Sequence, residues 1–245
     1  MTSNSSREKI LARVREAIAD NKIEGGLNKF ELPPVPVVWQ TDDDNNTNID
    51  LNKNNLISEF KKNIEQVSGE FVECKNRLEI VKHIANIVRE LDKAEVGIIA
   101  PGNTFVRDNA EELKLITGVK LYDPPETKQQ IDMLSVAELS TCDIGIIEPE
   151  ALLADTGSGL FCAKTRFERL AVYLPPISVI VATESILYKN LPEAWKEVNN
   201  KIKETKTGEF VIVTGPSRTA DIEKILILGV HGPKRVVVYL LRDEK

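Results

Sequence analysis

The chain has 245 residues, with 32 Lys and Arg against 38 Asp and Glu, which gives a formal net charge of −6. An acidic chain without a long basic run is a poor candidate for nonspecific nucleic-acid binding, because such binding depends on Lys and Arg neutralising phosphates. The hydrophobic fraction of 42% is ordinary for a soluble globular protein. The length suits one large domain or two small ones.

Three cysteines, Cys74, Cys142 and Cys162, lie far apart in the sequence. A disulfide framework calls for an even number of cysteines, and a structural zinc site or an iron–sulfur cluster normally needs four ligands at short spacings. With only His83 and His231 to add, a Cys/His metal site is not expected, and we assign no metal or identifiable cofactor to the chain. The sequence does not exclude a metal site built from carboxylates.

The first 54 residues are expected to stand apart from the main domain. Residues 1–24 begin with a Ser-x-x-Glu capping spacing and continue with apolar residues at helical period, which predicts an amphipathic helix. Residues 25–54 are rich first in proline and then in Asp and Asn, which is typical of an extended arm. The charged start is unlike a signal peptide and no apolar run would span a bilayer, so we expect a cytoplasmic protein without membrane contact.

Residues 55–245 are predicted to form an α/β domain in which strands alternate with helices. The expected strands are 71–74, 96–100, 119–122, 143–148, 160–163, 177–183, 209–214 and 235–241. The expected helices are 78–91, 104–115, two pieces within 127–140, 187–202 and 219–227. Strands that are apolar on both faces indicate a mostly parallel sheet covered by helices, and in such sheets ligands bind at the carboxyl ends of the strands.

The first candidate loop, 100–104, joins a strand to a helix through a Pro-Gly turn. Asn103 and Thr104 are suited to cap the helix, and a strand, a glycine turn and a helix start together form a ready anion site. A plain capped helix is the other interpretation of this loop.

The second candidate loop, 154–159, follows the strand 143–148 and reads ADTGSG. Its small residues would let a ligand approach the backbone, with Thr156, Gly157 and Ser158 as the contacts. A hairpin turn stabilised by Asp155 explains the same residues without a ligand. The spacing matches neither a dinucleotide fingerprint nor a phosphate-binding P-loop.

The third candidate loop begins TGPSRTADIE at 214 and is followed by LGVHGP at 228. Arg218 offers a planar set of donors for a carboxylate or phosphate, although Asp221 could pair with it instead. His231 is a general-base candidate because it lies in a loop between glycines. The substrate-binding candidates are therefore Asn103, Thr104, Thr156, Gly157, Ser158, Ser217, Arg218, Thr219 and Asp221, and the catalytic candidates are His231 and Asp155.

The motifs ADTGSG, VTGPSRTADIE and LGVHGP occur in this order, after an N-terminal SSREKILARVREAI and a PPVP segment. In this combination the chain resembles the lactate-utilisation protein C family, also called the LUD-domain or YkgG-like family, over nearly its whole length apart from the Asp/Asn-rich arm. The resemblance implies a three-layer α/β/α fold shared with glucosamine-phosphate isomerase, ribose-phosphate isomerase and coenzyme A transferases.

The resemblance also implies a role in bacterial oxidation of L-lactate to pyruvate, as one of three proteins acting together. The implied partners are an iron–sulfur protein and a cysteine-rich protein, and a homo-oligomer is a further possibility. Two alternatives stay open: a non-catalytic assembly or regulatory subunit, and a stand-alone sugar-phosphate isomerase or acyl-transfer enzyme. The fold relatives suggest Gly102-Asn103-Thr104 as a phosphate loop and the strand-end Glu148 as a nucleophile. In every case we expect the segments around Thr104, Gly157 and Arg218 to meet at one rim of the sheet.

Overall fold

The computed structural model describes residues 53–100, 103–122, 140–163, 165–203, 209–220, 226–228 and 232–243. The chain divides into units Met1–Ile49 and Asp50–Lys245, and the description concerns the second unit. The helix expected over 1–24 and the arm expected over 25–54 lie outside the described residues, except that Lys53 and Asn54 are helical and the predicted end of the arm is wrong at these two residues. Nearly all of the helical segment expected within 127–140 also lies outside the described residues.

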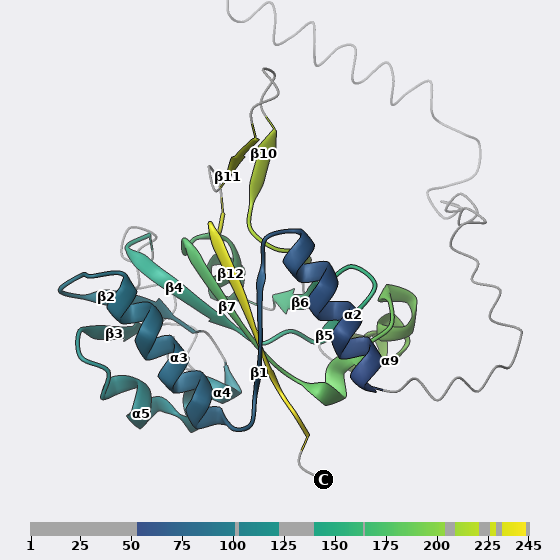
Figure 1. Cartoon of the computed structure of the whole chain (residues 1–245), viewed down its shortest axis with the longest axis horizontal. Coiled ribbons are helices and arrows are strands. Elements are labelled where there is room, and N and C mark those ends of the chain that lie inside the picture. The colour runs from purple at the N-terminus through teal and green to yellow at the C-terminus, as the bar shows by residue number, and fades with distance from the viewer. Residues whose placement is uncertain are drawn as a thin grey trace, which may run out of the picture. The chain divides into compact units, whose positions relative to one another are not determined.

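A parallel sheet forms the centre of the described part of the chain, in the strand order β1-β12-β7-β4-β2-β3 (Figure 1). Its strands are β1 (Glu70–Cys74), β2 (Val96–Ile99), β3 (Val119–Tyr122), β4 (Cys142–Ile147), β7 (Ile177–Thr183) and β12 (Arg235–Leu241). Four of them are buried along most of their length, which explains the continuous apolar runs in the sequence. The predicted α/β class with a mostly parallel sheet is confirmed.

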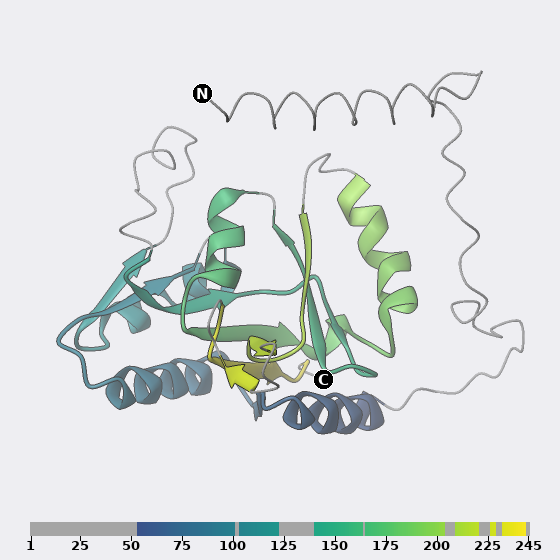
Figure 2. The ribbon, with the colours of Figure 1, turned by 90° about the horizontal axis from the view of Figure 1, so that it is seen from above.

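Helices cover one face of this sheet, and helices together with a second sheet cover the other, which Figure 1 shows on the two sides of β1 and Figure 2 shows from above. The helices α3 (Arg77–Glu90), α4 (Thr104–Asp108) and α5 (Ala110–Lys114) contribute buried side chains to the core on the first face. The helices α2 (Lys53–Gln66) and α8 (Arg166–Tyr173) pack on the opposite face. Each helix buries one apolar stripe, and the two resulting cores hold the sheet between them.

The second sheet is smaller and mixed, in the order β8-β5-β6-β9. Its strands are β5 (Ala151–Leu153), β6 (Ser158–Ala163), β8 (Leu187–Tyr188) and β9 (Glu209–Val213). One face contributes to the core shared with α2 and α8, and the other packs on α9 (Leu191–Lys203). A short 3₁₀ helix, η2 (Glu184–Ile186), joins β7 to β8.

Several local predictions are wrong. The segment expected to be a helix over 219–227 contains the antiparallel strands β10 (Arg218–Ala220) and β11 (Leu226–Leu228), which form a ribbon beyond the main sheet (Figure 1). The single helix expected over 104–115 is divided into α4 and α5 at Asn109. Helices α2 and α8 were not expected at all. No described helix has the length and apolar character needed to cross a membrane.

Candidate functional site

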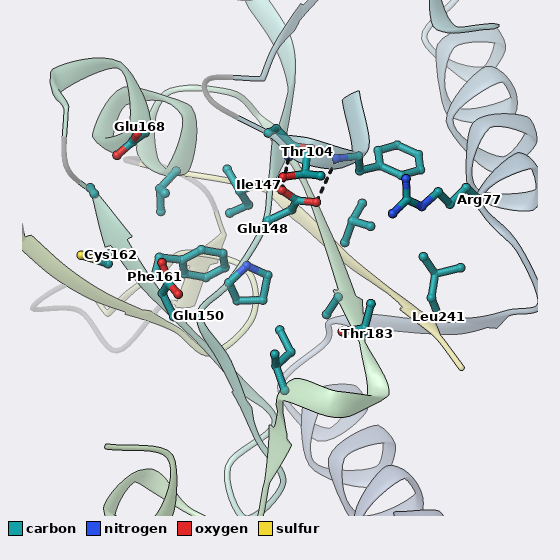
Figure 3. Close-up of a pocket in the computed structure, with 18 residues that line it drawn as sticks. Arg77, Thr104, Ile147, Glu148, Glu150, Phe161, Cys162, Glu168, Thr183 and Leu241 are labelled. Atoms are coloured by element: carbon teal, nitrogen blue, oxygen red, sulfur yellow. Dashed lines mark hydrogen bonds between the residues drawn. The ribbon is translucent and has the colours of Figure 1, made fainter. Parts of the chain in front are cut away.

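A cavity of about 390 Å³ opens at the carboxyl edge of the parallel sheet (Figure 3). The ends of β4, β7 and β12 contribute Glu148, Thr183 and Leu241, while α3 and α4 contribute Arg77 and Thr104. The last residues of β6, Phe161 to Ala163, line the cavity on the side of the second sheet. Its position agrees with the rule that parallel sheets bind ligands at the carboxyl ends of their strands, and its volume is within the roughly 300–1,000 Å³ of small-molecule sites.

Asn103 fixes the start of α4 at the rim of this pocket. Its Oδ1 accepts the backbone N–H of Val106 at 2.9 Å, and its Nδ2 donates to the carbonyl of Ile146 at 3.3 Å. The side chain is 6% exposed, so both bonds are protected from water. The predicted helix cap is confirmed, and the same amide ties the helix to the end of β4.

Glu148 takes the position that the sequence suggested for an external anion. Its Oε2 accepts the backbone N–H of Thr104 at 2.7 Å and its Oε1 accepts the backbone N–H of Phe105 at 3.0 Å (Figure 3). The first free donors of α4 are therefore satisfied by the protein's own carboxylate. The interpretation of this loop as a phosphate site loses its main support, because a phosphate would have to displace Glu148.

The remaining charged groups make the pocket acidic. Glu150 and Glu168 also line it, and Arg77 is the one described cation in its lining. The guanidinium of Arg77 is paired with Asp108, and Glu168 accepts the backbone N–H of its own helix cap at 3.1 Å. Within the described residues, no three His, Cys, Asp or Glu side chains are placed to hold a metal ion.

The second candidate loop is a hairpin turn between β5 and β6 that packs on the end of α2. Asn63 donates its Nδ2 to the carbonyls of Ala154 and Asp155 at 2.8 and 2.9 Å. Gly157 has φ +65°, and a Cβ there would overlap the backbone nitrogen of Ile64. The hairpin turn of the alternative interpretation is therefore observed, whereas its stabilisation by the Asp155 side chain stays a prediction. The glycine is required by the close approach of α2.

Hydroxyl groups link this turn to the third candidate loop. Ser158, which is 1% exposed, bonds to the hydroxyls of Thr156 and Thr214, each at 2.8 Å. Arg218 donates to the Oγ of Ser68 at 3.0 Å, just beyond the end of α2. We call this region, residues 63–68 with 154–158 and 214–218, the α2 junction.

The α2 junction continues to the amino edge of the parallel sheet. The backbone N–H of Ser217 donates to the carbonyl of Pro233 at 2.8 Å, and Lys234 donates to the carbonyl of Pro176, which precedes β7. Arg218 begins strand β10, where the sequence had predicted the start of a helix. Thr219 lies in the same strand, while Asp221 and His231 lie outside the described residues.

The three loops therefore do not share a rim. Asn103 and Thr104 lie at the carboxyl edge, whereas Gly157 and Arg218 belong to the α2 junction toward the amino edge. The expectation that all three would build one pocket is wrong, because the loops lie at opposite edges of the sheet. Strand β6 runs between the two regions, from Ser158 in the α2 junction to Ala163 in the pocket wall. Glu148 was expected only as a nucleophile suggested by the fold relatives, and Arg77, Phe161 and Thr183 were not predicted to line the site. Glu148 directly follows the buried strand β4 and Thr183 ends the buried strand β7, so the preference of ligands for the carboxyl ends of parallel strands points to both of them.

Comparison with known proteins places the chain in a family. The LUD domain model matches residues 57–241. The chain belongs to the LUD domain family. This LUD domain is 27% identical over 128 residues to a "Lactate utilization protein C" of Shouchella clausii, covering 52% of this chain and 53% of that protein. It is 26% identical over 151 residues to the "Uncharacterized protein YkgG" of Escherichia coli, covering 60% and 63%.

The chain spans about half the length of the first of these relatives. A crystal structure of a DUF162 family protein from Deinococcus radiodurans superposes with a TM-score of 0.53 at 17% identity, covering 77% of this chain and 98% of that one. This similarity supports the fold of the LUD domain. The predicted family is confirmed.

Proposed function

We propose that this LUD domain protein takes part in lactate utilisation, as one component of a system that oxidises L-lactate to pyruvate. The proposal is supported by membership of the family and by relatives from several bacteria that carry the name lactate utilization protein C. The oxidation removes two electrons and two protons from lactate, so the system needs an electron acceptor. We place that acceptor on iron–sulfur and cysteine-rich partner proteins.

The carboxyl-edge pocket is where we propose that the chain binds an organic ligand. The observation that carries this assignment is the cavity itself, which has an exposed carboxylate, Glu148, fixed by two backbone N–H groups. The acidic lining favours an organic cofactor over a small free carboxylate as the ligand of this pocket. Arg218, which was expected to bind that carboxylate, lies in the α2 junction and donates to Ser68.

Growth on L-lactate tests both parts of the proposal. A strain that lacks this gene and any other lactate dehydrogenase is complemented with the wild type, with Glu148→Ala or with Glu111→Ala. Glu111 is a matched control because it lies on α5, does not line the pocket and has a side chain that is 87% exposed. We expect no growth without the gene, full growth with the wild type and Glu111→Ala, and impaired growth with Glu148→Ala.

The outcomes separate the alternatives. Normal growth of the deletion strain on L-lactate would contradict the lactate role altogether. Full growth with Glu148→Ala, at wild-type protein levels, would contradict the role of the pocket and support the non-catalytic assembly subunit. The purified wild-type protein can also be tested for thermal shifts with sugar phosphates and acyl-coenzyme A, which tests the alternative of a stand-alone sugar-phosphate isomerase or acyl-transfer enzyme.

A further inference from the structure

Strand β9 forms an open edge of the second sheet in the part of the chain that the structure describes. It pairs with β6 and with no other described strand, and the register against β6 runs without a shift from Glu209 to Val213. Such an edge presents backbone N–H and C=O groups to which another strand can bind, and natural proteins usually protect it with a charge, a proline or a bulge. The four residues Phe210–Val213 contain neither a charge nor a proline.

The other three edges of the two larger sheets carry this kind of protection. In β1, Glu70 and Glu73 are paired with arginines. In β3, the exposed Lys120 interrupts the apolar residues. β8 is only two residues long. Among these edges, β9 is therefore the one that is best suited to accept a further strand.

Three apolar side chains are exposed beside this edge. Phe210 and Ile212 of β9 are 39% and 48% exposed, and Trp195 of α9 is 37% exposed. The rings of Trp195 and Phe210 make an edge-to-face contact with a centroid distance of 4.9 Å, so the helix and the strand form one surface. Phe210 and Ile212 lie on the same face of β9 because they are two residues apart. We call these three residues the β9 patch.

The β9 edge is complementary to itself. When two copies of β9 pair antiparallel about a two-fold axis at Val211, Phe210 of each copy lies opposite Ile212 of the other. Both pairs lie on the exposed face, and an aromatic residue opposite a β-branched one is a favourable cross-strand pair. A single two-fold contact therefore covers both exposed side chains of each strand, as in the symmetric interfaces of most homodimers.

The charges near the edge are also compatible with a second copy. Each chain carries a net charge of −6, so two copies repel and associate most readily through a surface without net charge. Glu209 is the one charged residue of β9, and its carboxylate is paired with the Arg169 guanidinium at 3.0 Å. In the pairing about Val211, the two Glu209 residues are displaced by about 13 Å along the strands, which exceeds the screening length of about 8 Å at physiological salt.

We propose that two copies of the chain associate through β9, paired antiparallel about Val211. The pairing joins the two second sheets into one continuous sheet and covers the β9 patch of both copies. This inference goes beyond the proposed function and does not depend on it.

The area of the β9 patch sets the expected strength of the dimer. With about 200 Å² of surface for each large side chain, the exposed parts of the three residues amount to about 250 Å² per copy. That is about a third of the roughly 800 Å² that each partner buries in a standard interface. Pairing of the two backbones adds to this area. We therefore expect a reversible dimer that forms as the protein concentration rises.

Sedimentation velocity of the full-length chain, from about 1 μM to about 500 μM, tests the proposal. We expect the wild type to shift from monomer toward dimer over this range. Phe210→Glu and Ile212→Lys should each raise the dissociation constant by about tenfold or more, because the introduced charge would be buried opposite an apolar side chain. Leu115→Lys is the matched control, since Leu115 is an 82% exposed apolar residue outside the β9 patch, and it should dimerise as the wild type does.

An equal mixture of the Phe210→Glu and Ile212→Lys proteins tests the register. In the mixed dimer, the introduced carboxylate of one copy lies opposite the introduced ammonium of the other, and the second pair keeps Phe210 opposite Ile212. We expect the mixture to regain dimer at concentrations where each variant alone is monomeric. Failure to regain it would overturn the antiparallel pairing about Val211.

Each variant is first checked for the wild-type circular dichroism spectrum and thermal midpoint. If one of the two β9 variants loses its fold, the other decides the case, because both side chains are exposed. A wild type that stays monomeric at every concentration would overturn the proposal and would leave the edge to a partner of another kind. A dimer that persists unchanged in a folded Phe210→Glu or Ile212→Lys variant would overturn it as well.

Discussion

Gly157 offers a direct test of whether the ADTGSG segment is a structural junction or a ligand loop. The residue has φ +65°, where an L-residue is strained by about 1–2 kcal/mol. A Cβ at this position would also lie 2.8 Å from the backbone carbonyl carbon of Asn63 and would overlap the nitrogen of Ile64. Both neighbours are backbone atoms of α2, so no side-chain rotation can relieve the contact.

The expected loss for Gly157→Ala adds these two costs. Overpacking in a rigid core costs about 1–3 kcal/mol, and moving α2 away would also stretch the two hydrogen bonds that Asn63 donates. We expect the free energy of unfolding to fall by about 3 kcal/mol. For a domain of this size, that is a decrease of about 6–12 °C in the thermal midpoint.

Gly118→Ala is the matched control, because Gly118 also has a positive φ, +80°, but its added Cβ would lie 3.0 Å from a single carbonyl oxygen, that of Ala94. Urea denaturation of both variants gives the two losses on one scale. If Gly157→Ala costs no more than Gly118→Ala, the contact with α2 does not explain the glycine. The result would then favour the interpretation of ADTGSG as a ligand-binding loop.

Four further predictions concern buried groups. Burial raises the pKa of Cys74 and Cys142 to about 11, whereas Cys162 is partly exposed, so Ellman's reagent at pH 8 should titrate one thiol in the folded chain and three in denaturant. Because these thiols lose protons at lower pH when unfolded, the free energy of unfolding measured in urea should fall as pH rises from about 9 to about 11. Asp143→Ala should lower the free energy of unfolding in urea by about 1–3 kcal/mol, because its buried carboxylate accepts from the side chain of Lys93 and the backbone of Gly97. Ser178→Ala should leave the thermal midpoint unchanged or raise it, because the buried Oγ has no hydrogen-bond partner in the described structure.

The parallel sheet could be predicted because its strands are short apolar runs that are buried on both faces. β7 and β12 illustrate this, since ISVIVAT and RVVVYLL admit few other interpretations. Helix α2 was missed because its sequence follows a polar arm, although its buried residues Leu56, Ile57, Phe60 and Ile64 have helical spacing. The β10–β11 ribbon was mistaken for a helix because three-residue strands are too short for a period of 2 to be told from one of 3.6.

The site could be predicted only in part, because the most recognisable motifs are not at the pocket. Glycines and hydroxyl residues in ADTGSG and TGPSR indicate that another group lies close to the backbone. For Gly157, the structure shows that this group is helix α2. For Gly215, it is the turn after α2, because a Cβ added at Gly215 would lie 2.9 Å from the side chain of Val67. A single sequence does not distinguish approach to a ligand from approach to another segment, since both require the same small residues.

Strand β6 connects the α2 junction to the wall of the pocket. It begins at Ser158, which is bonded to Thr214, and ends at Ala163 in the pocket wall, with Phe161 two residues earlier. At about 3.3 Å per residue the two ends are about 17 Å apart, and β6 pairs with β5 and β9 along its length. We therefore expect a change that displaces the junction to shift the strand that positions the Phe161 ring. Residues of the motifs can in this way affect ligand binding without contacting a ligand, and loss of binding in a junction variant would not by itself place those residues in the site.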